Sequence, residues 1–153
     1  MPDSLNPQQM KTLMRVALGQ EKADLVIERG DLVNVYSGEL IRNQSVAVKG
    51  KWIAYVGPDA GHCLGTETRR IDATGKVLIP GLLDAHTHLL FYCTPDEFLR
   101  YGMRGGTTTV VTELAGAIMS CSYQGLVELL AALQDQPIKI FVTVSPSITL
   151  SES

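Results

Sequence analysis

Two of the chain's three histidines, His86 and His88, stand one residue apart at the end of the apolar run "KVLIPGLLDAHTH", and Asp84 precedes His86 by the same spacing. Residues two apart on a β-strand point to the same side, so an extended conformation would place all three side chains on one face. Two neutral imidazoles that converge on a point bind a divalent metal, and a nearby carboxylate orients an imidazole through its other ring nitrogen. The pattern predicts His86 and His88 as metal ligands and Asp84 as a supporting carboxylate.

The surroundings of the pair favour a metal site over two solvated loop histidines, which share the bare His-x-His pattern. An apolar run interrupted by Pro80 and Gly81 leads into the pair. The segment that follows, "TPDEFLRYGMRGG", predicts a short helix with Thr94 and Glu97 as a capping box. Groups at the C-terminal ends of strands form the active site of an α/β barrel, and the histidines occupy that position.

Four other residues are of a type that takes part in chemistry. Glu113 ends the β-branched run "TTTVVTE", and it is either a metal ligand or supporting carboxylate, or a surface carboxylate. Cys93 and Cys121 are interpreted as small buried thiols, because free cysteine packs as a hydrophobe. His62 lies in a Gly-rich segment and is interpreted as a solvated surface histidine.

The order of expected elements predicts an α/β chain in three parts, residues 1–21, 22–79 and 80–153. The first part is a helix with Pro7 at its first position. The second part is β-rich, with hairpins of an antiparallel sheet interrupted at "RGD" and turning at "KGK". The third part alternates strand, helix, strand, helix, strand, a pattern typical of a parallel sheet with right-handed crossovers.

Composition limits the function classes. The 153 residues are 45% hydrophobic and 19% charged, with a net charge of −3, which indicates a globular protein. The weakly acidic balance argues against nucleic acid as a partner, and the lack of a long apolar run argues against a membrane. Three scattered cysteines and the lack of a signal-type N-terminus predict a cytoplasmic location.

The motif "PGLLDAHTH" resembles the first-strand signature of the amidohydrolase superfamily of metal-dependent hydrolases. The runs "MRVALGQEKADLVI", "LVNVYSGEL" and "GTTTVV" make the adenine deaminase branch the nearer resemblance, from about Gln8 to about Thr149. The resemblance implies the start of a (β/α)8 TIM-type barrel preceded by part of a small β-sandwich. It also implies a divalent metal site, binuclear, with manganese or iron and zinc as the alternative.

The activity that this resemblance implies is the hydrolysis of a purine base, adenine, to hypoxanthine and ammonia. His86 and His88 would bind one metal, and Asp84 would be the carboxylate that orients a histidine ligand. The family continues after "GTTTVV" with an Asp-Pro-His-Glu type of segment, whereas this chain reads "TELAGAIMS". That departure leaves open whether Glu113 takes the place of a lost site residue.

A barrel of this type needs about 200 residues or more, and far fewer follow Pro80. We therefore expect a truncated barrel that is inactive alone and that forms homo-oligomers through open strand edges. Two alternatives stay open. One is a cyclic amide hydrolase of the dihydroorotase or hydantoinase type, and the other is a non-catalytic binding or assembly module that holds no metal.

Overall fold

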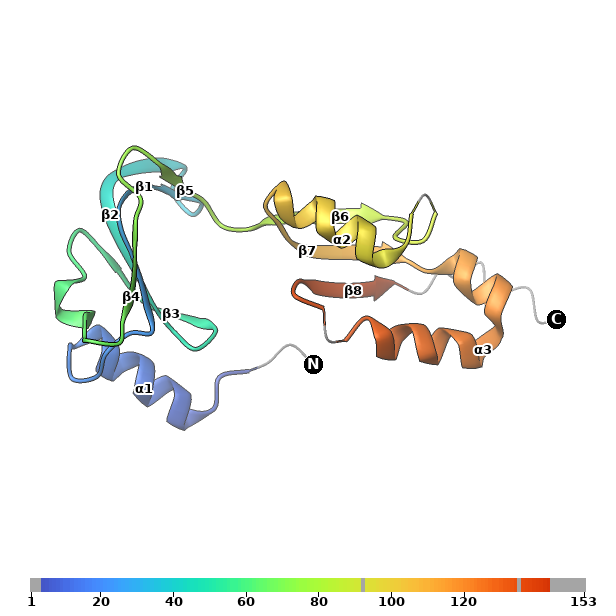
Figure 1. Cartoon of the computed structure of the whole chain (residues 1–153), viewed down its shortest axis with the longest axis horizontal. Coiled ribbons are helices and arrows are strands. Elements are labelled where there is room, and N and C mark those ends of the chain that lie inside the picture. The colour runs from blue at the N-terminus through green and yellow to red at the C-terminus, as the bar shows by residue number, and fades with distance from the viewer. Residues whose placement is uncertain (1–3, 92, 135, 144–153) are drawn as a thin grey trace. The chain divides into compact units, whose positions relative to one another are not determined.

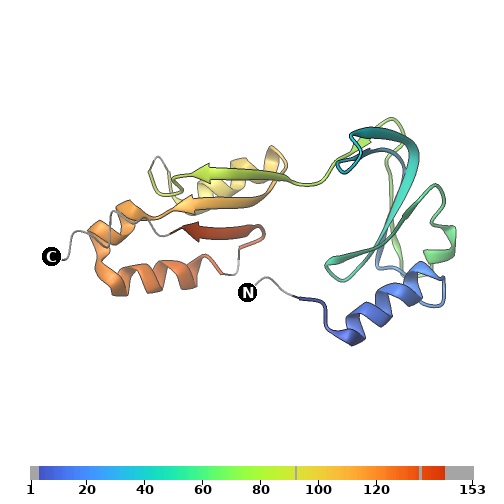
Figure 2. The same ribbon diagram turned by 180° about the vertical axis from the view of Figure 1, so that it is seen from behind.

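The computed structural model describes residues 4–91, 93–134 and 136–143. The chain folds as two compact units, Met1–Pro80 and Gly81–Ser153, whose elements are labelled in Figure 1 and seen from behind in Figure 2. Each unit contains a β-sheet and helix, so the predicted mixed α/β class is confirmed. The assignment of the units to a sandwich and to a barrel stays a prediction.

The first unit is built on one mixed sheet in the order β3-β2-β1-β4, with β5 also paired to β1. Strand β2 is antiparallel to β1 and β3, whereas β4 and β5 run parallel to β1. The predicted antiparallel hairpin pairing is confirmed for β1–β2 and β2–β3, but the sheet is mixed, because the long connection after β3 returns the chain in the direction of β1. The elements are α1 (Pro7–Ala17), β1 (Leu25–Asn34), β2 (Glu39–Lys49), β3 (Trp52–Gly57), the 3-10 helix η1 (Gly61–Cys63), β4 (Arg69–Asp72) and β5 (Val77–Leu78).

The predicted break at "RGD" is instead a bulge within the continuous strand β1. The pairing of β1 with β2 shifts register on both sides of Gly30, and Arg29 has a φ of 63°. A Cβ on Gly30 would lie 2.6 Å from the side chain of Leu78 on β5. The glycine is therefore needed for close packing of β5, and the bulge bends the strand without ending it.

Helix α1 begins as the sequence predicts. The Asn6 side chain accepts a hydrogen bond from the Gln9 backbone N–H at 2.8 Å, and the Gln9 side chain accepts one from the Asn6 backbone N–H at 2.9 Å. Pro7 occupies the first helical position, where no N–H is needed. These reciprocal bonds satisfy donors that the first turn of a helix leaves unpaired.

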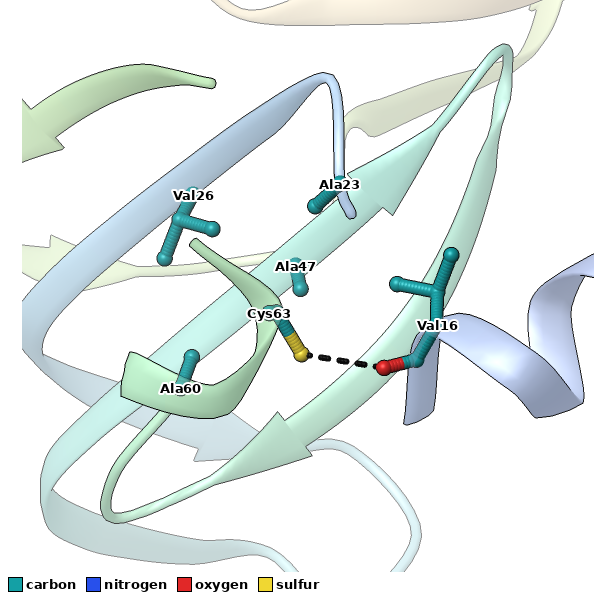
Figure 3. Close-up of a cluster of buried hydrophobic side chains, with 6 residues drawn as sticks. All are labelled: Val16, Ala23, Val26, Ala47, Ala60 and Cys63. Carbon is teal, nitrogen blue, oxygen red and sulfur yellow. Dashed lines mark hydrogen bonds between the residues drawn. The ribbon is translucent and has the colours of Figure 1, made fainter. Parts of the chain in front are cut away.

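Small side chains form the core of this unit, between α1, η1 and one face of the sheet (Figure 3). The Cys63 thiol points at the end of α1 and donates a hydrogen bond to the Val16 carbonyl oxygen at 3.3 Å. Burial raises the pKa of this thiol, so Cys63 acts as a packing residue. The buried cluster comprises Val16, Ala23, Val26, Ala47, Ala60 and Cys63.

The second unit contains three parallel strands in the order β6-β7-β8, which lie side by side in both views (Figures 1 and 2). The predicted alternation of strands and helices is confirmed. The apolar run before the histidines does not form one strand, because Pro80 has no N–H to donate and the chain divides there into β5 and β6. The elements are β6 (Leu82–Thr87), α2 (Pro95–Arg104), β7 (Thr107–Glu113), α3 (Ala115–Ala132) and β8 (Lys139–Thr143).

The start of α2 differs in detail from the prediction. Thr94 is the N-cap residue, but its side chain makes no capping hydrogen bond. Glu97 is drawn instead to Arg100, whose guanidinium donates to the carboxylate at 2.6 Å. The capping box is therefore wrong, although Pro95 occupies the first helical position as expected. In the part of the chain that the structure describes, no helix is both long and apolar enough to cross a membrane.

Asp24 connects three segments of the first unit. Its carboxylate accepts hydrogen bonds from the Gly50 backbone N–H at 2.7 Å and from the Lys49 ammonium at 2.8 Å. Its backbone carbonyl accepts one from the Arg69 N–H at 3.0 Å. The Gly50 N–H and the Lys49 ammonium hold the pKa of the Asp24 carboxyl below its usual range.

We expect Asp24→Asn to lower the free energy of unfolding by about 1 kcal/mol at neutral pH, because the half-exposed carboxylate loses charge-assisted bonds. Because the pKa of Asp24 is lower in the folded state, the carboxylate stabilises the fold at pH values above the unfolded-state pKa of 3.8. This stabilisation is lost as the pH falls through the folded-state pKa. The difference between the wild-type chain and the variant should therefore shrink as pH falls below 3.8 and vanish once the carboxyl is protonated in the folded state too. Urea unfolding from pH 2 to 7 measures it, with exposed Glu67→Gln as the control. A pH-independent difference would contradict this account.

One face of the first sheet carries an apolar row, Ile71, Ile27, Val46 and Val56, defined by direct cross-strand pairing. Its outer members, Ile71 and Val56, are exposed. The opposite face carries the buried cluster. Exposed apolar side chains such as Ile71 and Val56 on a sheet favour association with another surface.

We expect the chain to self-associate. The double variant Val56→Lys with Ile71→Lys should lower the association constant at least tenfold, because the contact between copies then buries two fewer apolar side chains. Sedimentation equilibrium measures this constant. Tyr36→Lys, which alters an exposed aromatic residue at the β1–β2 turn, is the matched control and should leave association unchanged. A wild-type chain that is monomeric at high concentration would overturn the prediction.

Candidate metal centre

The C-terminal half of β6 contains a bulge that shapes the approach to the histidines. Asp84 pairs with Val110 and Thr87 with Thr112, so three steps along β6 match two along β7. The irregularity falls on Ala85 and His86, and Asp84 Oδ1 accepts a hydrogen bond from the His86 backbone N–H at 3.2 Å. Bulges redirect side chains at strand ends. The Asp84 carboxylate thus contacts the His86 backbone. Its role in orienting a histidine ring nitrogen stays a prediction.

The structure brings the two imidazoles together. His88 follows β6 directly, and its ring centroid lies 5.1 Å from that of His86, with the planes at 85°. The Phe91 ring lies 5.8 Å from the His88 ring. Both histidines are exposed, so an ion from solvent has access to their nitrogens.

Glu113 joins the pair from the neighbouring strand. Its Oε2 lies 3.8 Å from His88 Nδ1, which is within ion-pair range but longer than a hydrogen bond. The Glu113 side chain is 21% exposed, against 44% for His88. The site therefore consists of two imidazoles from the end of β6 and one half-buried carboxylate from the end of β7.

Thr112 is a site residue that the sequence analysis missed. Its buried hydroxyl accepts a hydrogen bond from the Leu89 backbone N–H at 3.1 Å, which fixes the residue after His88 to the residue before Glu113. The Thr143 hydroxyl on β8 donates to the Thr112 carbonyl oxygen at 3.4 Å. The available signal was the position of Thr112, two residues after Val110 and therefore on the same side of the strand.

Leu89 is itself fully buried, in the core cluster of the second unit. The loop that carries His88 is therefore anchored by packing as well as by its hydrogen bond. The cluster comprises Leu89, Leu99, Val110, Leu114, Leu133 and Ile138.

The three remaining candidates are Cys93, Cys121 and His62. Cys93 is exposed, so its prediction as a buried thiol is wrong, because it lies at the surface just before α2. The side chain of Cys121 lies outside the described residues. His62 is exposed, as expected, and belongs to the first unit, where its Nε2 lies 3.0 Å from the Ala17 carbonyl oxygen and its ring lies edge-on to Tyr55.

The donor set fits part of a metal site. Imidazole nitrogen and carboxylate oxygen suit manganese, iron and zinc. Within residues 4–91, 93–134 and 136–143, however, no group of three or more His, Cys, Asp or Glu side chains is arranged to hold an ion. Because a protein site uses three or four ligands, His86 and His88 supply about half of one.

Two curated relatives of this chain are both named adenine deaminase. The chain is 41% identical over 133 residues to adenine deaminase 3 of Rhizobium meliloti, which is 86% of this chain and 22% of that protein. It is 38% identical over 132 residues to the adenine deaminase of Cenarchaeum symbiosum, again 86% of this chain and 22% of that protein. The chain thus spans about 22% of the length of these relatives. No protein-family model matches the chain.

Solved structures show a related fold. An N-acyl-D-glutamate deacylase from Bordetella bronchiseptica, complexed with zinc and an inhibitor, matches 81% of this chain and 30% of that protein at a TM-score of 0.62 and 23% identity, a likeness that shows the fold alone. A D-aminoacylase with a binuclear metal centre matches 59% of this chain and 18% of that protein, at a TM-score of 0.51 and 34% identity.

We expect Thr112→Val, which keeps the shape but removes the hydroxyl, to lower the free energy of unfolding by about 1–3 kcal/mol, because the buried Leu89 N–H loses its acceptor. Denaturant unfolding and hydrogen exchange of the Leu89 amide measure the effect. Thr108→Val, at an exposed position of the same strand, is the control and should change stability by less than about 0.5 kcal/mol. Equal effects of the two variants would contradict the anchoring role.

Proposed function

We propose that this chain, which is homologous to the N-terminal part of the adenine deaminases, contributes the first metal ligands of a hydrolase that converts adenine to hypoxanthine and ammonia. The match to the Rhizobium meliloti protein carries this proposal. The matched region covers 133 of the 153 residues, so only 20 residues lie outside it. Wherever the matched region begins, it therefore includes the segment from Asp84 to Glu113. The histidine pair at the end of a parallel strand is consistent with that role.

The residues of the site have separate tasks in this proposal. His86 and His88 would hold one divalent metal of a binuclear pair through ring nitrogens, with manganese or iron in the site and zinc as the alternative. The chemistry that a metal held there would supply is a lowered pKa of bound water, and hence a nucleophile for C6 of the purine near neutral pH. The half-buried Glu113 and the Thr112 anchor keep the imidazoles in place.

The fold supports a larger architecture. The three parallel strands would be the first strands of a (β/α)8 barrel, and the first unit would form part of a small sandwich beside it. The remaining ligands and the catalytic acid and base would come from the additional length that the relatives have. The chain by itself would be inactive, and we expect a cytoplasmic, self-associating protein.

Amide hydrolysis is a second candidate, favoured by two observations. The D-aminoacylase is 34% identical over the part that matches. The segment after β7 reads "TELAGAIMS", where the resemblance to adenine deaminases leads us to expect an Asp-Pro-His-Glu type of segment. Both candidates use the same histidine pair, so the substrate separates them.

A graft tests the proposal directly. The matched N-terminal part of the Rhizobium meliloti protein is replaced by this chain, and the release of hypoxanthine and ammonia from adenine is measured with added Mn²⁺. We expect activity, and we expect His86→Ala and His88→Ala each to lower kcat/KM by more than about 100-fold, because loss of a supporting partner alone costs about 10–100-fold.

His62→Gln in the same graft is the matched histidine control, since glutamine retains a donor for the Ala17 carbonyl and the site lies in the other unit. It should retain activity within about twofold. A parallel graft into the D-aminoacylase tests the second candidate. Activity in that graft alone, or a deaminase graft indifferent to His86 and His88, would overturn the proposal.

A further inference from the structure

We propose that Glu113 is the positioning residue for His88: its carboxylate holds the imidazole proton on Nδ1 and leaves Nε2 free for the metal. The inference rests on the proposed function for the identity of what Nε2 binds. It assigns to Glu113 the orienting task that sequence spacing suggests for Asp84. The reasons are the sheet register, the anchoring of both residues and the hydrogen-bonding capacity of the two groups.

The sheet register makes His88 and Glu113 neighbours. Thr87 pairs with Thr112 in the parallel ladder, so His88 and Glu113 are the next residue on each strand. The distance of 3.8 Å between His88 Nδ1 and Glu113 Oε2 follows from this arrangement. A shortening of roughly 1 Å, within the reach of a glutamate side chain, converts the ion-pair contact into a hydrogen bond.

Both residues are held from outside the pair. The Leu89 N–H, directly after His88, donates to the Thr112 hydroxyl, directly before Glu113. Glu113 is also paired with Thr143 on β8, which fixes the backbone on its other side. The Phe91 ring lies edge-on to His88, with 5.8 Å between the ring centroids. The backbones that carry the carboxylate and the imidazole are therefore tied to each other and to β8.

The chemistry of the contact selects one tautomer. An ionised carboxylate can only accept hydrogen bonds, so the ring nitrogen that faces it must carry the proton. A neutral imidazole has one N–H, so protonation of Nδ1 leaves the Nε2 lone pair for a ligand bond. The contact of Asp84 lies instead at the backbone of His86, whose N–H donates to Asp84 Oδ1.

Long-range proton–nitrogen NMR of the full chain, recorded metal-free above the usual imidazole pKa range, reads the tautomer of each of the three histidines. We expect His88 to carry its proton on Nδ1 and Glu113→Gln to shift it toward Nε2. Asp84→Asn is the matched control and should leave the His88 tautomer unchanged. The signals of His62 and of the Leu89 amide report whether each variant retains its fold.

Zinc titration of the same proteins supplies the second readout. We expect Glu113→Gln to weaken Zn²⁺ binding about 10–100-fold and His88→Ala to weaken it further. A tautomer unchanged in folded Glu113→Gln overturns the inference, even where Zn²⁺ binding falls, since Glu113 would then be a direct ligand. A tautomer shift in a chain that does not bind Zn²⁺ supports the positioning contact, and the deaminase graft with its His86 and His88 variants then decides the proposed function.

Discussion

The hydrogen bond from the Leu89 backbone N–H to the Thr112 hydroxyl is the interaction on which the candidate site depends. It joins residues 23 apart in sequence, and it is buried. The parallel ladder between β6 and β7 pairs residues only as far as Thr87 and Thr112, so it does not hold the segment that carries His88. Because a buried N–H must find an acceptor, a side chain replaces the missing ladder partner there. The sheet register brings Glu113 level with His88, and this bond holds the segment of His88 at that level.

Hydrogen bonds between side chains and the backbone of distant segments also connect the first unit. The Asp24 carboxylate accepts the Gly50 N–H, and the Thr68 hydroxyl donates to the Ala23 carbonyl oxygen at 2.7 Å. Three of the six residues in the buried cluster are alanines, which remove little apolar surface from water. Polar bonds of this kind therefore fix the connections of a unit whose core side chains are small.

The fold was predictable where its cause is local. Helix α1 follows from Asn6, Pro7 and Gln9, because a cap acts within one turn. Strand β7 follows from its β-branched run. The bulge at Gly30 was not predictable, since a glycine between two β-rich runs indicates a turn and a bulge equally well. The side chain that decides between them, Leu78, lies 48 residues further along the chain.

The candidate site, too, was predictable only where its cause is local. The meeting of His86 and His88 follows from their spacing, but the choice of the carboxylate that serves them does not. A carboxylate two residues before a backbone N–H tends to accept from it, and Asp84 does so at His86. The acid nearest in sequence is therefore engaged by the backbone. Glu113 lies 25 residues beyond His88 in the chain, yet the register of β6 and β7 places its carboxylate at the ring. Sheet register, rather than spacing along one strand, selects the acid that faces the imidazole.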